Sequence, residues 1–410
     1  MSFQQGLSGL NAASKNLDVI GNNVANSGTV GFKQSQAQFA DVYASSLNGS
    51  GSSQVGIGTK VSQVAQQFTQ GNITSSNNPL DIAINGNGFF RLSNNGTVSY
   101  SRNGQFQLDK SGYIVNATGA RLTGYTANSS GVLSTGAPAE ININTADIPP
   151  QVTSTVNAVL NLDSSSAVPT GGAFDMTNPT TYNNATSVSI YDSLGNSHTL
   201  QTFYVKTAAN TWNVYAADDG TAIGYVPPAA AVPVGTLTFN SSGTLTGGSP
   251  VPIAVPVTTG AGTPFTVNVD YTGTTQFGST FSVNSLKQDG YTSGKLSGFS
   301  TGSDGTIVGR YTNGQSATLG QVVLASFTDP NGLQPLGDNA WAETAASGAA
   351  LVGSPGSGPL GSLQSSATED SNVDLTAELV NMITAQRNYQ ANAQTIKTQD
   401  QVMQTLVNLR

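Results

Sequence analysis

The sequence predicts a mostly β protein with an α-helix at each end, in which the terminal helices pair as a coiled coil and two antiparallel β domains are nested, one inserted in the other. Near both ends, apolar residues recur at alternating steps of four and three, which is the spacing of a coiled-coil seam. Between the ends, short runs of alternating apolar residues are separated by turn dipeptides such as Asn-Gly, the pattern of antiparallel hairpins. The 47 glycines and the low charged fraction of 9% fit β domains joined by many turns.

The composition also excludes several classes of protein. The net charge is −8 and the 14 basic residues are scattered, so nucleic acid is not expected as a partner. The chain has no cysteine, hence no disulfide and no thiolate site. Its first residues lack the features of a cleaved signal peptide, and no apolar run reaches the ~20 residues of a membrane span. We therefore expect no membrane insertion, and either a cytosolic protein or one that leaves the cell without a cleaved signal.

The longest predicted element is a helix over residues 373–410, which no glycine or proline interrupts. Ser371, with Asp374 three residues later, is expected to form a capping box at its start. Gln386 and Asp400 are polar seam positions, which cost stability but set register and partner number. The apolar positions of this seam are Leu375, Leu379, Met382, Tyr389, Ala393, Ile396, Met403 and Val407.

A second, weaker amphipathic helix is expected from the N-terminus to about Ala25. Ser14 and Gly21 occupy two of its seam positions and bury little, and a helix of this length is marginal in isolation. The apolar stripes of the two helices must pack against each other, against the central body or against other copies of the chain. The spacing alone does not exclude an ordinary helical hairpin within one chain. The large apolar residues of the N-terminal stripe are Phe3, Leu7, Leu10, Leu17 and Val24.

The chain is expected to be nested, so that segments from its two halves combine. The predicted parts are the paired helices (1–30 and 371–410), linker or extended segments (31–78 and 348–370), a β domain (79–146 and 288–347) and an inserted outer β domain (147–287). Within the linkers we expect a short helix over 34–44, flexible Ser/Gly-rich links over 45–54 and 348–362 that serve as hinges or plain spacers, and a strand over 55–68.

The β domains are predicted from alternation and turn signals. The first begins at Leu80 and is expected to be a compact meander, with Asn-Gly turns at 95–96 and 103–104 and further strands around the Asn-Gly pair at 313–314. Its expected strands are 80–84, 88–92, 97–101, 105–108, 113–116, 121–125, 306–311 and 318–327. Those of the inserted domain are 152–162, 186–191, 198–206, 212–216, 236–239, 251–257, 265–271 and 280–283, and a surface loop is expected over 226–234.

Residue patterns for catalysis are weak. The single histidine, His198, is expected to be an ordinary exposed or hydrogen-bonded strand residue rather than a metal ligand. The run around Ser300 matches the nucleophile-elbow pattern, but no helix is expected after it and the histidine precedes it. The acidic pairs at 218–219 and 369–370 are expected to be solvated turns. We therefore expect no catalytic residue, no metal site, no cofactor and no enzymatic activity.

The terminal motifs are familiar. Asn22-Asn-Val-Ala-Asn26 with Gly31-Phe-Lys33, the run 80–90 (LDIAINGNGFF) and the C-terminal runs 371–375, 385–389 and 396–400 resemble the flagellar rod and hook axial proteins. These motifs cover about a third of the chain. The signature residues that the resemblance identifies are Asn22, Asn23, Asn26, Gly31, Phe32, Lys33, Asn372, Asp374, Gln386, Arg387, Asn388 and Tyr389.

The resemblance implies a structural subunit of a tubular helical polymer outside the cell, exported through the flagellar type III channel without cleavage. Rod proteins of this family are shorter, so the extra block 147–287 favours a hook subunit, which acts as a universal joint between rod and filament. The implied partners are other copies of the chain, a hook cap protein, the distal rod protein and a hook–filament junction protein. A distal rod subunit and, with less support, a β-rich surface adhesin remain as alternatives.

Overall fold

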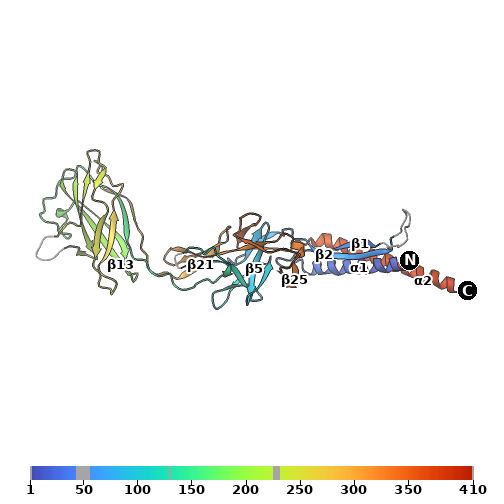
Figure 1. Ribbon diagram of the computed structural model, residues 1–410. Coiled ribbons are helices and arrows are strands. Elements are labelled where there is room, and N and C mark those ends of the chain that lie inside the picture. The colour runs from blue at the N-terminus through green and yellow to red at the C-terminus, as the bar shows by residue number, and fades with distance from the viewer. Residues whose placement is uncertain (1, 43–55, 129–130, 225–230, 409–410) are drawn as a thin grey trace. The chain divides into compact units, whose positions relative to one another are not determined.

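The structure is a computed structural model that describes residues 2–42, 56–128, 131–224 and 231–408 (Figure 1). Contacts divide the chain into two compact units. Unit 1 comprises Met1–Thr145, Gly298–Arg310 and Ser316–Arg410, and unit 2 comprises Ala146–Ser297 and Tyr311–Gln315. Unit 2 is therefore inserted in the sequence of unit 1, and the chain is mostly β with one helix at each end. The finer domain boundaries expected from the sequence stay predictions.

The two terminal helices form where the apolar periodicity predicts them. They are α1 (Ser2–Ala25) and α2 (Leu375–Asn408). The expected capping box is wrong in one respect, because Asp374 rather than Ser371 caps α2. The Asp374 carboxylate accepts hydrogen bonds from the backbone N–H groups of Thr376 and Ala377, at 2.8 and 3.1 Å, which satisfies two of the unpaired donors at the helix start.

The segment after α1 is a strand and not the short helix expected over 34–44. Strand β1 (Ser35–Val42) pairs antiparallel with β2 (Gly58–Gln66), and α1 contacts both strands. Local propensity in such a short segment is weak compared with a complete ladder of backbone hydrogen bonds to a partner strand. The strand expected over 55–68 is confirmed by β2, whereas the link expected over 45–54 lies outside the described residues.

The β domain of unit 1 is built around one large sheet. Its strand order is β21-β22-β23-β9-β5-β6-β26-β25, and β7, β8, β10, β24 and β27 attach beside this path. Two further pairs, β28 with β4 and β29 with β3, form separate two-stranded sheets. The bounds of all these strands are β3 Ile73–Ser75, β4 Ile82–Asn85, β5 Phe89–Asn94, β6 Thr97–Ser101, β7 Gln107–Leu108, β8 Ile114–Val115, β9 Arg121–Thr126, β10 Ala139–Glu140, β21 Leu296–Thr301, β22 Thr306–Tyr311, β23 Ser316–Val322, β24 Leu324–Ser326, β25 Gln334–Gly337, β26 Ala340–Ala342, β27 Leu351–Gly353, β28 Ser362–Ser365 and β29 Ala367–Glu369, with a short 3-10 helix at Pro330–Gly332.

This sheet is not the sequential meander that was expected, because β5 pairs with both β6 and β9. The tight turn expected at 95–96 is confirmed: Asn95 and Gly96 both have positive φ, at 50° and 88°, between the paired ends of β5 and β6. An aromatic cluster closes the core beside the sheet, with Trp341 edge-on to Phe89 and Phe68. Non-local contacts of this kind, rather than turn signals, decide which strands are neighbours.

The segment 348–362 is not a free link. Within it, β27 pairs with β24, and the backbone N–H of Gly361 donates to the carbonyl of Asn87 at 2.7 Å. The chain that follows pairs as β28 with β4 and as β29 with β3. The flexible link expected over 348–362, whether as a hinge or as a plain spacer, is therefore wrong, since its backbone is bound into the domain.

Unit 2 consists of two sheets over one apolar core. One sheet has the order β18-β19-β11-β20, and the other has the order β12-β13-β14-β16-β17 with β15 beside β14. Trp212 and Tyr204, both fully buried, lie in the core with residues of the opposite sheet. The bounds are β11 Thr155–Asn161, β12 Asn184–Tyr191, β13 Ser197–Ala208, β14 Thr211–Asp218, β15 Thr221–Ala222, β16 Gly235–Phe239, β17 Leu245–Gly247, β18 Val251–Val255, β19 Phe265–Asp270 and β20 Ser282–Gln288, with a 3-10 turn at Pro179–Thr181.

Candidate functional site: the paired terminal helices

The terminal helices lie side by side and antiparallel (Figure 1). Small residues let them approach closely. A Cβ atom added at Gly6 would lie 3.1 Å from Cγ1 of Ile396, and one added at Gly9 would lie 2.7 Å from the Asn392 side chain. Side chains this small at a helix contact reduce the distance between the two axes, as ridges-into-grooves packing requires. The buried apolar positions with larger side chains are Ala13, Ile20 and Ala385.

The large apolar residues expected at the seam divide into two groups. Leu10, Leu17, Val24, Met382, Ala393 and Ile396 are partly buried. Phe3, Leu7, Leu375, Leu379, Tyr389, Met403 and Val407 are exposed. Small residues such as Gly6 and Gly9 therefore take part in the helix contact beside larger ones, and a search for large apolar residues overlooks them. The role of the predicted residues in self-assembly stays a prediction.

One face of α2 is apolar and open to solvent. We define the outer face of α2 as Leu375, Leu379, Val380 and Ile383, whose exposed fractions are 46%, 45%, 59% and 52%. Leu375, Leu379 and Ile383 are spaced by four residues and so share one side of the helix. The sequence reasoning missed Val380 and Ile383 because it followed a single seam, although the second stripe is visible in the same spacing.

Asparagine side chains attach both helices to the β1–β2 hairpin. The buried Asn23 of α1 donates to the carbonyl of Ser35 at 2.8 Å and accepts from its N–H at 2.9 Å. Asn372, just before α2, accepts from the N–H of Gln34 and donates to the carbonyl of Gln67, both at 2.7 Å. Each side-chain amide thus pairs with backbone N–H and C=O groups that have no partner strand at this end of the hairpin.

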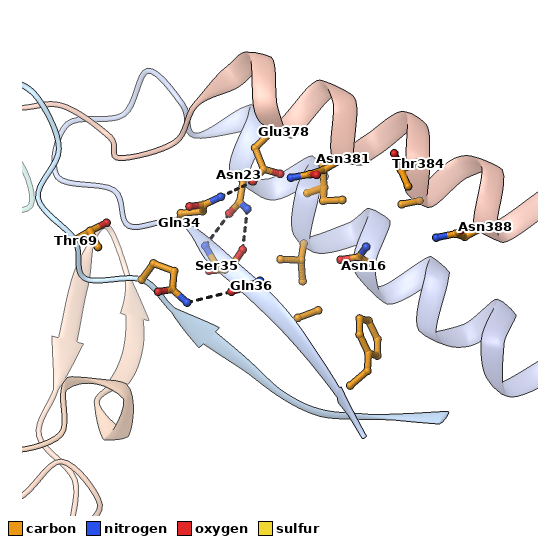
Figure 2. A pocket seen from close by; sticks show the side chains of 16 residues that line it. Asn16, Asn23, Gln34, Ser35, Gln36, Thr69, Glu378, Asn381, Thr384 and Asn388 are labelled. Atoms are coloured by element: carbon orange, nitrogen blue, oxygen red, sulfur yellow. Dashed lines mark hydrogen bonds between the residues drawn. The ribbon is translucent and has the colours of Figure 1, made fainter. Parts of the chain in front are cut away.

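A polar groove of about 560 Å³ lies between α1, α2 and β1 (Figure 2). Glu378, in the first turn of α2, accepts a hydrogen bond from Gln34, where the positive end of the helix stabilises a carboxylate. Its second carboxylate oxygen is buried and has no hydrogen-bond partner among the described residues. Amides line much of the groove, so it suits water or a polar segment rather than an apolar ligand. They include Asn16, Asn381 and Asn388.

A buried ion cluster connects the signature regions at the two ends of the chain. The Glu369 carboxylate lies 2.7 Å from Nζ of Lys33 and 3.1 Å from Nη1 of Arg102, and all three side chains are nearly inaccessible to solvent. Burial lowers the pKa of Lys33 and of Arg102, and the attraction of Glu369 opposes this shift. The expectation that the pair 369–370 forms a solvated turn is wrong for Glu369, because two cations and the N–H of Gly71 surround it.

The signature residues include a buried set and an exposed set, while Asn26 and Asn372 are partly buried. Asn23, Gly31, Phe32 and Lys33 are buried, whereas Asn22 and the run 386–389 are exposed. Asn26 donates to the side chain and the carbonyl of Asn22 and so terminates α1. The buried set holds one chain together. The exposed set includes Gln386, Arg387, Asn388 and Tyr389.

We expect Gly31→Ala to destabilise unit 1 by about 2 to 3 kcal/mol. Gly31 has φ +72°, and an added Cβ would lie 2.6 Å from the backbone N of Asn103, so both strain and overlap with rigid backbone oppose the substitution. Gly96→Ala is the matched control, since Gly96 has φ +88° but open space around it, and strain alone should cost about 1 kcal/mol. Urea unfolding measures both, and equal losses would contradict the steric account.

Ser300 does not occupy a nucleophile elbow, because it lies inside strand β21 rather than at a strand-to-helix turn. His198 belongs to the other unit. Among the described residues, no helix is both long enough and apolar enough to cross a membrane.

Four family models match this chain along its length. The model described as flagella basal body rod protein matches residues 3–33, and the flagellar hook protein FlgE/F/G D1 domain matches 83–190. The flagellar basal body protein FlaE D2 domain matches 161–291, and the flagellar basal body rod FlgEFG protein C-terminal model matches 364–409.

Curated proteins match over the full length. The chain is 46% identical over 414 residues to the flagellar hook protein FlgE of Salmonella typhimurium and 46% identical over 417 residues to that of Escherichia coli, covering 100% of both chains in each comparison. It is 34% identical over 451 residues to the hook protein of Borreliella burgdorferi, with 100% and 99% covered. The crystal structure of Helicobacter pylori flagellar hook protein FlgE2 matches with a TM-score of 0.50 and 14% identity, over 72% of this chain and 99% of that chain, which supports the fold alone.

Proposed function

Because this chain belongs to the flagellar hook protein family, we propose that its paired terminal helices are the element through which subunits polymerise, with the outer face of α2 as a main contact. The chain is a structural subunit of the flagellar hook, a flexible helical tube that transmits torque from the rod to the filament. Head-to-tail contacts that do not close into a ring build such a tube. The further proposal concerns which surface makes these contacts.

The observation that carries the proposal is the unpartnered apolar face of α2. Completing the burial of four half-exposed aliphatic side chains offers about 1 kcal/mol each, taking half of the ~1.5–3 kcal/mol for full burial. A contiguous apolar stripe on a free subunit usually marks an interaction surface. Because hook proteins polymerise, we propose that a neighbouring subunit in the tube covers the outer face of α2.

The far end of α2 supports the same conclusion. Gly6, near the start of α1, lies opposite Ile396, so the last turns of α2 extend beyond the described part of α1. Val402, Met403 and Val407 in these turns are 49%, 60% and 71% exposed. If these residues become buried only on assembly, a new subunit adds most favourably at a growing tip, where several neighbouring subunits are already in place.

The specific partners follow from family membership and are proposed on that basis. They are a hook cap protein, the distal rod protein, a hook–filament junction protein and the flagellar type III export apparatus. We also propose an extracellular location in the flagellum, reached without a cleaved signal peptide. Outer surfaces rich in Ser, Thr and Asn would allow small, hydrated contacts between subunits that exchange partners at low cost while the hook bends.

The test compares two double variants of the full chain. Val380→Ser with Ile383→Ser should raise the critical concentration for tube formation at least about tenfold, since a loss of 1.4 kcal/mol per contact is tenfold in affinity. Unfolding of the free subunit should change by only about 0.5 kcal/mol or less, because both side chains are exposed. Sedimentation and negative-stain electron microscopy under salting-out conditions give the readout.

The matched control is Gln390→Ser with Gln394→Ser, which places the same new residues at exposed polar positions of the same helix. It should assemble within about twofold of the unmodified chain, since no apolar area is removed. If the double variant at Val380 and Ile383 forms tubes at the same critical concentration as the unmodified chain, the assembly contacts lie on another surface and the proposal is wrong.

A further inference from the structure

His198 is the single histidine of the chain, and it is buried among three carboxylates in unit 2. Its Nδ1 lies 2.8 Å from Oδ2 of Asp219 and 3.7 Å from Oδ2 of Asp218, and its Nε2 lies 3.5 Å from Oδ2 of Asp192. The expectation that the pair 218–219 is a solvated turn is therefore wrong for Asp218, which is only 6% exposed.

The hairpins of unit 2 bring these residues together from distant parts of the sequence. The β13–β14 register places Leu200 opposite Asp218, so His198 lies beside the turn that follows β14. In that turn Asp219 and Gly220 have positive φ, at 46° and 79°, which reverses the chain into β15 and directs two successive carboxylates toward one imidazole. A sequence search sees only one histidine and an isolated acidic pair.

Asp192 holds the imidazole from the opposite side. Its carboxylate is fully buried and accepts hydrogen bonds from Thr259 Oγ1 at 2.6 Å and from Asn196 Nδ2 at 2.9 Å. These bonds, together with backbone donors, keep the pKa of Asp192 well below its usual range despite its burial. Asp192 thus orients the ring from the Nε2 side, as carboxylates commonly orient histidine ligands of metals in proteins. Nδ1 is hydrogen-bonded to Oδ2 of Asp219 at 2.8 Å, so it binds an ion only when the ion displaces this hydrogen bond.

Asp218 also has an unpartnered buried oxygen. Oδ1 of Asp218 is inaccessible to solvent and has no hydrogen-bond partner among the described residues. Among the described residues, His198 is the one cationic partner of Asp192, Asp218 and Asp219, so three carboxylates share a single imidazole. A buried carboxylate oxygen without a donor is costly, so this side of Asp218 can accept a further cation.

We propose that His198, Asp218 and Asp219 bind one divalent transition-metal ion of the zinc type. One ligand atom from each residue lies within 4.8 Å of the others. One imidazole nitrogen and two carboxylate oxygens, with water as the fourth ligand, form a donor set that zinc accepts, and ligand atoms around a tetrahedral zinc lie about 3.3 Å apart. The observed separations of 2.8 and 3.7 Å bracket this spacing.

The site is accessible and adjustable on one side. The Asp219 side chain is 53% exposed, so it can move away from Nδ1 when an ion enters, while Asp218 and His198 stay fixed by packing. The larger, oxygen-only shell of calcium fits less well, since it requires six or more oxygen ligands. Bound zinc would cross-link β13 to the β14–β15 turn and so stabilise unit 2.

The test is a zinc titration of the full chain purified without a polyhistidine tag, at about pH 7.5 because metal binding requires deprotonated ligands. We expect one zinc ion per chain by calorimetry, a higher melting temperature of unit 2 and a shift of the His198 ring nitrogen signals in NMR spectra. Cobalt(II) should bind at the same site and give visible absorption bands. The single histidine makes the NMR signals unambiguous.

Asp219→Asn and Asp218→Asn should each weaken zinc binding at least about tenfold. Asp175→Asn is the control, because Asp175 is an exposed aspartate in the same unit and its removal changes the charge equally; binding should stay within about twofold. Asp219 is half exposed, so its variant folds even if the Asp218 variant does not. Equal zinc affinity in Asp219→Asn and the unmodified chain, or no change in the His198 signals at saturating zinc, would overturn the proposal.

Discussion

Glu369→Gln is expected to lower the free energy of unfolding of unit 1 by about 3 to 5 kcal/mol, the usual cost of removing one partner from a buried ion pair. Glu369 compensates two buried cations, Lys33 and Arg102. A neutral amide of the same shape preserves the packing but leaves both positive charges in the interior without a counter-ion. Because Lys33 follows α1 and Glu369 precedes α2 in the chain, the loss falls on the region that holds the terminal helices.

Lys33→Met should cost less, about 1 to 2 kcal/mol. It removes the Lys33 hydrogen bonds to Glu369 and to the carbonyl of Thr69, but it leaves Arg102 and Glu369 as a balanced pair. Asp41→Asn, at an exposed position of β1, is the control for removing a carboxylate and should be near neutral. Urea unfolding followed by fluorescence of Trp341 in a Trp212→Phe background reports unit 1 alone. Equal losses for the Glu369 and Lys33 variants would contradict this charge balance.

Trp212→Ala is expected to destabilise unit 2 by about 3 to 5 kcal/mol, the range for truncating a buried tryptophan. The Trp212 ring is fully buried between the two sheets, and its Nε1 donates to Oε1 of Gln276 at 3.1 Å. Truncation removes a large apolar surface and leaves a cavity, and it also leaves the buried Gln276 without this donor.

The same variant tests whether the two units unfold independently. Each unit contains one of the two tryptophans, Trp212 in unit 2 and Trp341 in unit 1. Calorimetry should show the unit 2 transition at a lower temperature and the unit 1 transition unchanged, as separate cores allow. Trp212→Phe retains most of the ring volume and should lose less. A joint shift of both transitions would show that the units fold as one.

Much of the candidate site was predictable because its signals are local. The spacing of Leu375 and Leu379, and the absence of glycine and proline after Asp374, identify α2 from the sequence alone. The identity of its neighbours was not predictable in this way. Gly6 and Gly9 form the contact with α2 because they are small, and a small residue carries almost no signal in a search for apolar periodicity.

The two helices, the tight turn at 95–96 and the family could be predicted from the sequence, since periodicity, turn dipeptides and signature runs depend on residues close together in the chain. Three-dimensional contacts were needed to show that the segment after α1 is a strand, that Glu369 is buried between two cations, and that His198 meets Asp218. In each case the deciding partner lies far away in sequence: β2 for β1, Arg102 for Glu369 and the β14–β15 turn for His198. Burial and charge pairing depend on such long-range contacts, so the same residues read as solvated turns or ordinary strand positions until the fold brings them together.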